Sequence, residues 1–461
     1  MKRSIFVMEL IVVLLIVSSV YAQSDKQDIK ESHFGIHLGN LIDGYHRLHS
    51  YIRELGNIYV RNEIWGDLHG WKKVKKGSSY IFASKELCEK CCDPKRSLSD
   101  PKKSQPKSYY CQSGQFYFCS PSSREGLIDM MPLVVDFYEN PNNLPFRWFL
   151  SVLTSRYDKK PPKNFPAGAY PYGNEDTYRG YIEYLVKRLG NKAKYWQIGN
   201  ENDYPKFWAG TPKEYARMLE IASKVIRGNC EDCKVGISFA SLDLKQDKKE
   251  NMWFQAIEHV RDAFDFIDGH YYTPRLIEPD ALDEWKKACP GKEFISTETG
   301  IPDVNLVWKE VIPEVGGTRE KQAQDLIKYI TTLFDAGYNK IYWYFIDHDF
   351  VPGVEDPWEH MGLLTKDFKK KPSFDSYKTM IEKVDYFTGI KKLNDGQYVY
   401  TFSDKNPVYV LWSDSGISAL PPDLKGTVNV TDYLGNEQIK SASDIVLTER
   451  PIFVEEIVKL P

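Results

Sequence analysis

Eight short apolar segments, separated by helix-like stretches, place the strongest constraint on the fold of this chain. They lie between residues 30 and 385, and their C-terminal ends turn polar. Parallel strands need helical crossovers, so this alternation indicates a parallel sheet, and eight such units predict a closed TIM (β/α)8 barrel. The predicted strands are Phe34–Leu38, Ile58–Trp65, Arg147–Leu153, Tyr195–Gly199, Lys234–Phe239, Phe264–Ile267, Glu293–Thr297 and Lys340–Phe345.

Two insertions depart from a minimal barrel. Residues 67–122 follow the second strand, are rich in Lys, Ser and Pro, and hold five of the eight cysteines. A second run, rich in Pro, Gly and Tyr, covers residues 161–178 after the third strand. Loops that follow barrel strands lie at the C-terminal face, where TIM barrels carry their active sites. We therefore expect both insertions to line a site.

The chain changes character after residue 385. Short alternating runs separated by Gly, Asn and Asp turns predict a small C-terminal antiparallel β-domain over residues 386–461, with a sandwich-like arrangement. The barrel would then occupy residues 30–385. The predicted strands of the β-domain are Tyr398–Phe402, Val408–Trp412, Thr427–Tyr433 and Ile445–Thr448.

Residues 1–22 have the pattern of an export signal. Lys2 and Arg3 precede an apolar stretch over residues 5–17, and Ala22 provides a small residue at the cleavage position. We expect a secreted or extracytoplasmic protein whose mature chain begins at Gln23. An uncleaved anchor helix is the alternative, although the stretch is short for a bilayer span and contains a glutamate. No later segment is apolar enough to span a membrane.

Composition excludes some partners and leaves others open. A net charge of −3 and an isoelectric point near 6.4 give no reason to expect binding to nucleic acid or to anionic membranes. The chain has 30 Tyr, 23 Phe and 11 Trp, and aromatic faces stack on sugar rings. A large α/β core also uses aromatic residues, so composition alone decides nothing.

Two glutamates stand at the ends of the fourth and seventh predicted strands, preceded by Tyr195–Asn200 and Glu293–Thr297. Glu201 and Glu298 should therefore face each other across the barrel mouth. Glycosidic cleavage with retention needs one carboxyl to protonate the leaving oxygen and a second, about 5–5.5 Å away, to attack the anomeric carbon. Either glutamate alone is more commonly an ordinary solvated residue, but the pair at these strands indicates catalysis.

Over residues 30–385 this pattern resembles clan A of the retaining glycoside hydrolases, which includes families 5, 39, 51 and 79. In that clan the fourth strand ends in Asn-Glu, matched here by Asn200 and Glu201. The seventh strand ends in the nucleophile, matched by Glu298. The resemblance implies that Glu201 is the general acid/base and that Asn200 binds the 2-hydroxyl of the sugar.

The resemblance also implies substrate-site roles for five further residues. Arg61 on the second strand would hydrogen-bond the nucleophile and keep it ionised. His270 and Tyr272, at the end of the sixth strand, would stand beside the nucleophile. Trp343 on the eighth strand would form the floor of the sugar subsite, and His37 on the first strand is a further subsite candidate.

Structural alternatives remain for several of these residues. Arg61 can be an ion-pair partner of the barrel, both histidines can be satisfied structural residues, and Trp343 can pack between strand and helix. Tyr271 and Tyr272 are neighbours on one strand and cannot both point inward, and we favour Tyr272.

The expected reaction needs no metal and no cofactor, and the expected partner is a carbohydrate. Glu201 would begin as an acid and, after a covalent glycosyl-enzyme forms on Glu298, act as the base that activates water. A transglycosylase would use the same two glutamates. A catalytically inactive carbohydrate-binding barrel is a third hypothesis, disfavoured because both glutamates, Asn200 and Arg61 are all present.

The cysteines favour disulfides if the chain is exported. We predict a local Cys230–Cys233 bridge, two bridges inside the insertion, and two unpaired thiols that include Cys289. Zinc held by the two Cys-x-x-Cys pairs is the alternative. The eight cysteines are Cys88, Cys91, Cys92, Cys111, Cys119, Cys230, Cys233 and Cys289.

Overall fold

The structure is a computed structural model that divides into two compact units, Met1–Ser32 and His33–Pro461, and the description below concerns the second. The predicted export signal and the five cysteines of the insertion lie outside the described residues. The described residues are 31–38, 45–67, 109–110, 116–117, 147–156, 175–190, 192–204, 207–208, 210–240, 242, 252–272, 279–303, 317–347, 360–415 and 419–457.

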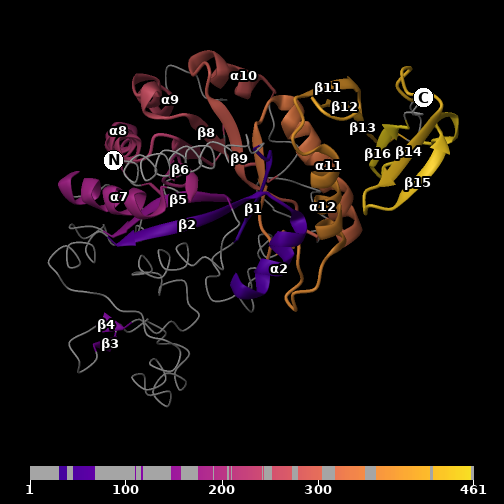
Figure 1. Cartoon of the computed structure of the whole chain (residues 1–461). Helices are drawn as coiled ribbons and strands as arrows, with labels where there is room; N and C mark the ends of the chain where they lie inside the picture. The colour runs from indigo at the N-terminus through magenta and orange to yellow at the C-terminus, as the bar shows by residue number, and fades with distance from the viewer. Residues whose placement is uncertain are drawn as a thin grey trace, which may run out of the picture. The chain divides into compact units, whose positions relative to one another are not determined.

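Eight parallel strands close into a barrel in the order β1-β10-β9-β8-β7-β6-β5-β2 (Figure 1). Each of the eight predicted strand segments overlaps one of them, so the predicted TIM barrel is confirmed. Counted along the chain, β6 is the fourth barrel strand and β9 the seventh. The strands are β1 Phe34–His37, β2 Tyr59–Asp67, β5 Arg147–Arg156, β6 Ala193–Ile198, β7 Lys234–Phe239, β8 Phe266–Gly269, β9 Glu293–Thr299 and β10 Lys340–Trp343.

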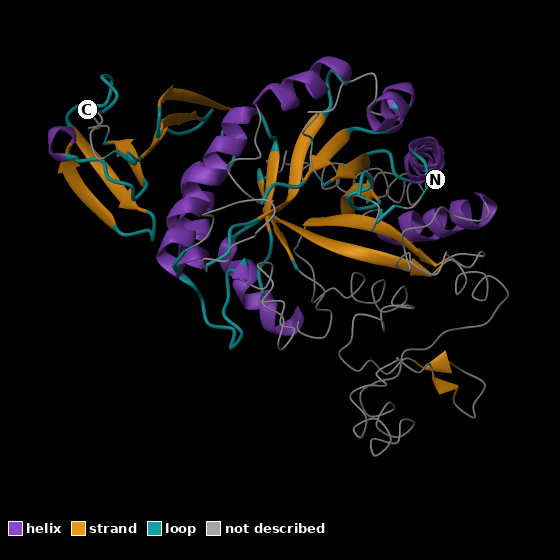
Figure 2. Ribbon diagram, turned by 180° about the vertical axis from the view of Figure 1, so that it is seen from behind, coloured by secondary structure: helices purple, strands orange, loops and turns teal. Residues whose placement is uncertain are grey.

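Helices lie on the outside of the barrel strands (Figure 2). Helix α8 has a complete capping box, because the Thr211 side chain accepts from the backbone of Glu214 and the Glu214 side chain accepts from the backbone of Thr211. Helix α11 ends at Gly337, whose φ of 103° lies in the left-handed region. The helices are α2 Tyr45–Leu55, α7 Glu175–Leu189, α8 Pro212–Asn229, α9 Met252–His259, the 3-10 helix η3 Arg261–Ala263, α10 Pro279–Ala288, α11 Arg319–Ala336 and α12 Pro372–Val384.

The inside of the barrel is filled in layers, because alternate residues of each strand point inward. One inward layer is a separate buried apolar cluster made of Tyr59, Tyr195, Phe266, Ile295 and Tyr342. Gly35 and Gly236 make room for it, since a Cβ atom would lie 2.2 Å from the Tyr342 ring at Gly35 and 2.0 Å from the Phe266 ring at Gly236.

Two residues further toward the C-terminal ends, the inward positions become polar. Arg61 lies two positions after Tyr59, Gln197 two after Tyr195, Asp268 two after Phe266 and Thr297 two after Ile295. All four polar residues are fully buried. The apolar layer therefore fills the lower part of the barrel interior. The polar layer lies above it, beneath the side chains at the barrel mouth.

Residues beyond the barrel form one antiparallel sheet of six strands, in the order β11-β12-β13-β16-β14-β15. This confirms the predicted antiparallel β-domain, and three of its four predicted strands are present. The fourth, Ile445–Thr448, is wrong, because these residues are not in a strand and β16 takes that place in the sheet. The strands are β11 Gly389–Asn394, β12 Gln397–Thr401, β13 Val408–Leu411, β14 Thr427–Asp432, β15 Glu437–Ser441 and β16 Ile452–Glu456.

Exposure explains why two of the three remaining strands, β11 and β15, were not predicted. All five residues of β15 and the last four of β11 are exposed, so neither strand has an alternating apolar face to mark it. The described strands make a single sheet, where a sandwich-like arrangement was expected. On one face of the sheet the buried residues, including Tyr400 and Val410, belong to the same apolar cluster as Leu333 and Phe334 of α11. On the other face, Leu411, Val428 and Val454 form a separate buried cluster. Helix residues of the barrel thus supply the layer that covers the first face.

The insertion contributes two short strands to the described residues, β3 Tyr109–Tyr110 and β4 Phe116–Tyr117, which pair antiparallel. The sulfur atoms of Cys230 and Cys233 are in contact just before β7, and Cys289 is buried with a free thiol. The bridge itself stays a prediction. None of the helices in the described part of the chain is long and apolar enough to cross a membrane.

Candidate active site

Glu201 stands on a tight turn that follows β6. Gly199 has a φ of 81°, and a Cβ atom there would lie 2.1 Å from Oδ1 of Asn202. Glu201 itself has a φ of 43°, which a non-glycine residue adopts only when its surroundings enforce it. Here the Glu201 N–H donates to Ser238 Oγ at 3.2 Å, and the Asn202 N–H donates to the Ser238 carbonyl at 3.0 Å. The turn therefore aims Glu201 at the mouth.

Glu298 lies inside the barrel beside the inward Thr297, because β9 has one extra residue between Ser296 and Thr299 relative to β10 and alternation is interrupted there. Glu298 is 6% exposed. Arg61 of β2 donates from Nη1 to Glu298 Oε1 at 2.6 Å and from Nη2 to Asn200 Oδ1 at 2.7 Å. Arg61 is completely buried. One guanidinium thus holds the carboxylate of the predicted nucleophile and the amide beside the predicted acid/base, as its rigid fork of donors allows.

The sixth barrel strand supplies the other partners of Glu298. Asp268 on β8, and His270 and Tyr272 in the extended segment that follows it, alternate and point inward, and the Tyr272 hydroxyl donates to Glu298 Oε2. Tyr271, between them, packs in the apolar core against Tyr338. Alternation on one strand therefore separates a tyrosine of the site from a tyrosine of the core.

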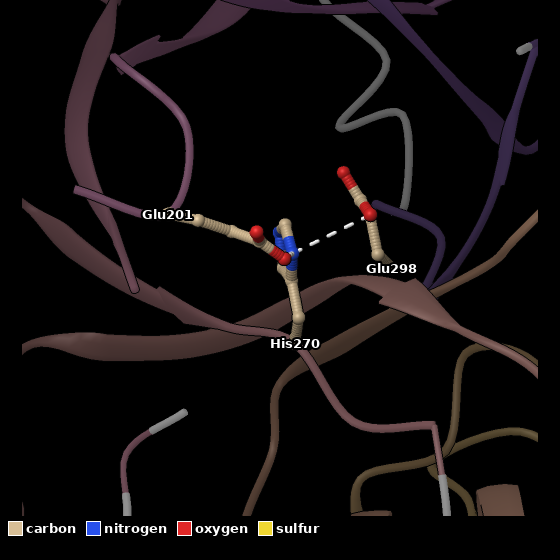
Figure 3. Close-up of side chains that lie close together, drawn as sticks. All are labelled: Glu201, His270 and Glu298. Atoms are coloured by element: carbon tan, nitrogen blue, oxygen red, sulfur yellow. Dashed lines mark hydrogen bonds and ion pairs between the residues drawn. The ribbon is translucent and has the colours of Figure 1, made fainter. Parts of the chain in front are cut away.

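His270 lies between the two glutamates (Figure 3). Its Nδ1 is 2.8 Å from Glu201 Oε1 and 3.4 Å from Glu298 Oε2, and its Nε2 is 3.0 Å from Asp268 Oδ2. Asp268 also accepts hydrogen bonds from Ser238 Oγ and from the backbone and hydroxyl of Thr297. These contacts connect β7, β8 and β9 beneath the mouth.

The charges of this cluster shift the ionisation of its members. Burial by itself lowers the pKa of His270, but the negative charges of Glu298 and Asp268 outweigh it and hold that pKa well above its ordinary value. Burial by itself raises the pKa of Asp268, but the charge and hydrogen bond of His270 bring it below its ordinary value. Burial, followed by the charge of Glu298, raises the pKa of Tyr272, so its hydroxyl stays a donor.

His37 reaches the same cluster from β1. Burial and the charge of Arg61 hold its pKa well below the ordinary value, so His37 is neutral. Its ring lies 4.9 Å from that of Tyr344. The Tyr344 ring also lies 5.7 Å from the Tyr272 ring. These aromatic rings line the side of the site next to Glu298.

Trp343 does not lie in the site, contrary to the expected sugar floor. It is completely buried, donates from Nε1 to the Met361 carbonyl at 2.9 Å, and belongs to the core outside the barrel strands. The physical reason is the two-residue period of β10, in which Tyr342 and Tyr344 point inward and Trp343 points outward. Tyr344, the next residue along the chain, is partly exposed and lies on the inward face instead.

The remaining predicted site residues come together around one centre: Asn200, Glu201, Arg61, His270, Tyr272, Glu298 and, at its edge, His37. Four residues of the site were not predicted from the sequence: Asp268, Ser238, Thr297 and Tyr344. A signal existed for two of them, because Asp268 and Tyr344 lie two positions from inward residues of their own strands.

A divalent metal would find ligands here. One atom each from Glu201, His270 and Glu298 lie within 4.8 Å of one another, and no other such group of acidic, histidine or cysteine side chains occurs among the described residues. In the structure each of these side chains already contacts another group of the site, since Arg61 and Tyr272 occupy both oxygens of Glu298. A cation would have to displace them, and the metal-free site stays a prediction.

Comparison with known proteins shows which solved structures have a similar fold. No protein-family model matches the sequence, and no curated protein matches it either. Among solved structures, a family 39 glycoside hydrolase from Bacteroides cellulosilyticus WH2 superposes with a TM-score of 0.58 and 15% identity, over 92% of this chain and 80% of that one. The chain has the fold of this hydrolase.

Other solved structures agree with this result. A family 39 β-xylosidase from Caulobacter crescentus gives a TM-score of 0.54 with 12% identity, covering 93% of this chain and 96% of its own. An endo-β1,6-glucanase gives 0.52 with 14% identity, covering 92% and 90%. Each comparison spans nearly the whole chain, so the similarity in fold extends beyond the barrel to the C-terminal sheet.

Proposed function

We propose that this protein is an exported retaining glycosidase that cleaves β-O-glycosidic bonds of oligo- or polysaccharides. The single observation that carries the proposal is the spacing of the two glutamates, which have carboxylate oxygens within 4.8 Å of each other. Retaining enzymes hold their carboxyls about 5–5.5 Å apart, whereas inverting enzymes leave about 6.5–9.5 Å for a water molecule. The hydrolases that share the fold support the substrate class, and the predicted signal supports export.

In the first step Glu298 attacks the anomeric carbon and the bond to the leaving oxygen breaks. Arg61 and Tyr272 favour the ionised nucleophile, because they donate to its two oxygens. Glu201 gives its proton to the leaving oxygen, so the sugar becomes an ester of Glu298 and the aglycone leaves as an alcohol. Glu201 is then a carboxylate.

In the second step Glu201 removes a proton from water, the resulting hydroxide equivalent attacks the anomeric carbon, and Glu298 leaves as a carboxylate. Asn200 supports both steps. Its Oδ1 accepts from Arg61, so its Nδ2 is the donor that would bind the sugar 2-hydroxyl. Two inversions at one carbon give net retention of configuration.

The test is a pair of substitutions measured on aryl β-glycosides. Glu298→Ala should abolish turnover, and azide should restore it by forming the inverted α-glycosyl azide. Glu201→Ala should still form the glycosyl-enzyme from substrates with good leaving groups, and azide should then give the β-glycosyl azide. Glu231→Ala, an exposed glutamate in the turn before β7, is the matched control and should leave kcat/KM unchanged.

A loss of less than about tenfold from both substitutions, or ~1.4 kcal/mol of barrier, would contradict the assignment. NMR of the first-formed product anomer separates retention from inversion. Binding of oligosaccharides with no turnover of any aryl glycoside would instead indicate a carbohydrate-binding barrel. Transfer to an added alcohol faster than to water would indicate a transglycosylase.

A further inference from the structure

His270 is the only described residue that touches both glutamates of the site through one atom. Its Nδ1 lies 2.8 Å from an oxygen of Glu201 and 3.4 Å from an oxygen of Glu298, and the ring is completely buried (Figure 3). The first distance is that of a hydrogen bond, and the second needs only a small movement of either side chain to become one. One donor therefore serves two acceptors on opposite sides.

Asp268 determines how the ring is protonated. The carboxylate is completely buried and accepts from Ser238 Oγ at 2.7 Å, from the Thr297 N–H at 2.8 Å and from Thr297 Oγ1 at 2.9 Å. An ionised carboxylate can only accept, so the His270 Nε2, 3.0 Å away, must carry a proton. The second ring nitrogen then faces the glutamates.

The two steps of the proposed reaction move one negative charge across this ring. In the free enzyme Glu298 is the carboxylate and Glu201 is the neutral acid. In the glycosyl-enzyme Glu298 is an uncharged ester and Glu201 is the carboxylate. One of the two is anionic in each state, and His270 Nδ1 lies within reach of both.

We propose that His270, held as an imidazolium by Asp268, is a counter-ion that the two glutamates share, and that its positive charge stabilises the negative charge on whichever of them carries it. His270 and Asp268 are positioning residues in this scheme, because they act through the glutamates and not on the sugar. No proton leaves His270 in either step, and its Nδ1 stays close to both carboxyl groups. The proposal rests on the proposed function.

The charged groups around His270 favour the imidazolium. Asp268 and Glu298 are the anions that most raise the pKa of His270, and together they outweigh the effect of its burial. Arg61 opposes them, but its guanidinium bonds Glu298 and Asn200. The titratable groups that face the ring are Asp268 and Tyr272 on its own strand, Glu298 on β9, Glu201 and Asp203 after β6, Arg61 on β2 and neutral His37 on β1.

Asp268→Asn tests the charge. Asparagine keeps the shape but removes the anion that raises the pKa of His270, so the ring should lose its proton at a lower pH. The alkaline limb of the kcat/KM profile should then move toward lower pH. Ser238→Ala is the control, since it removes one bond to Asp268 and keeps the anion; its rate falls, but its alkaline limb stays in place.

The charge of the ring can also be read without turnover. Nitrogen-15 NMR of histidine-labelled protein should show His270 as an imidazolium at pH 7 in the wild type, and Asp268→Asn should titrate at lower pH. The chain has nine histidines, so the His270 signal is assigned as the one lost in His270→Gln. If Asp268 had only a structural role, Asp268→Asn would lower the melting temperature and leave the titration of His270 unchanged.

His270→Gln tests whether both glutamates depend on His270 as their counter-ion. With a good leaving group kcat/KM reports the first step, and kcat reports the second when a pre-steady-state burst is seen. Both should fall at least about tenfold. A neutral His270 in the wild type at pH 7, an unmoved alkaline limb in Asp268→Asn, or a loss confined to one step overturns the proposal. Each can occur while Glu298→Ala is still rescued by azide, so failure here is distinct from failure of the proposed function.

Discussion

Arg61 and Glu298, 237 residues apart in the sequence, form an ion pair inside the barrel with Nη1 2.6 Å from Oε1. The side chain of Arg61 is 0% exposed and that of Glu298 is 8% exposed. The attraction inside such a buried pair is largely offset by the loss of hydration of both charges. The main consequence of the pair is therefore at the site, where it would hold the proposed nucleophile ionised and aligned.

Arg61→Lys should lower kcat/KM by about 100-fold, because a lysine ammonium cannot hold Glu298 and Asn200 at once in the geometry of the guanidinium fork. Circular dichroism should confirm that the variant is folded. Arg217→Lys is the matched control, since Arg217 is exposed and pairs with Glu175 on the helical surface; it should leave kcat/KM unchanged. Full activity of Arg61→Lys would mean that the ion pair is structural.

Tyr272→Phe and Tyr271→Phe remove the same hydroxyl from neighbouring positions of one strand. Tyr272→Phe should lower kcat/KM by about 100-fold, because it deletes a donor to Glu298. Tyr271→Phe removes a hydroxyl from the core and should change the melting temperature but not kcat/KM of the folded enzyme. Equal kinetic losses in both variants would contradict the inward position of Tyr272.

Substitution of Trp343 should mainly lower stability, and substitution of Tyr344 should mainly lower activity. Trp343→Phe reduces a completely buried side chain and should cost about 1–3 kcal/mol of unfolding free energy while leaving KM unchanged. Tyr344→Ala should change stability less and lower kcat/KM by about tenfold, because its ring borders the site next to His37 and Tyr272. Urea melts and steady-state kinetics measure both effects. A raised KM in Trp343→Phe with native stability would restore the original assignment.

Asp203 should make stability depend on pH. Burial raises its pKa to about 6, against the hydrogen bond from the Ala240 N–H that lowers it. The folded protein then binds this proton more tightly than the unfolded chain, in which the pKa is about 3.9. The free energy of unfolding therefore falls as pH rises from about 4 to 6. Asp203→Asn should melt higher than wild type at pH 7.5 and no higher at pH 3.5, and equal melting at both would contradict the raised pKa.

The thiols near β7 and β9 should differ in reactivity. Cys230 and Cys233, if bridged, should not react with iodoacetamide until reduced. The closed loop is short, and removing the bridge by Cys233→Ser should cost about 2 kcal/mol. Cys289 is buried, and burial raises the pKa of its thiol to about 11, so it should react only after unfolding. Mass spectrometry of labelled peptides measures the reactivity of all three cysteines. A labelled Cys230 in unreduced protein would contradict the bridge.

The barrel was predictable because its signal is local and repeated. Apolar runs of strand length alternate with capped helices, and eight of them admit one closed arrangement. The C-terminal sheet was harder, since β11 and β15 are exposed and polar and owe their strand form to their neighbours. The sixth barrel strand was predicted at Phe264–Ile267 and lies at Phe266–Gly269. That shift of two residues placed Asp268 outside the predicted strand and hid its role.

The sequence by itself determined the order of strands and helices and which strand ends carry Glu201 and Glu298, because strand length, helix caps and turn residues act over a few positions. Only the tertiary structure decided which side chains share the interior. It brought Arg61 onto Glu298, placed Trp343 in the outer core and Tyr344 at the mouth, and put His270 between the two glutamates. The inward face of each strand depends on the register of closure, and that register is set by packing around the whole barrel.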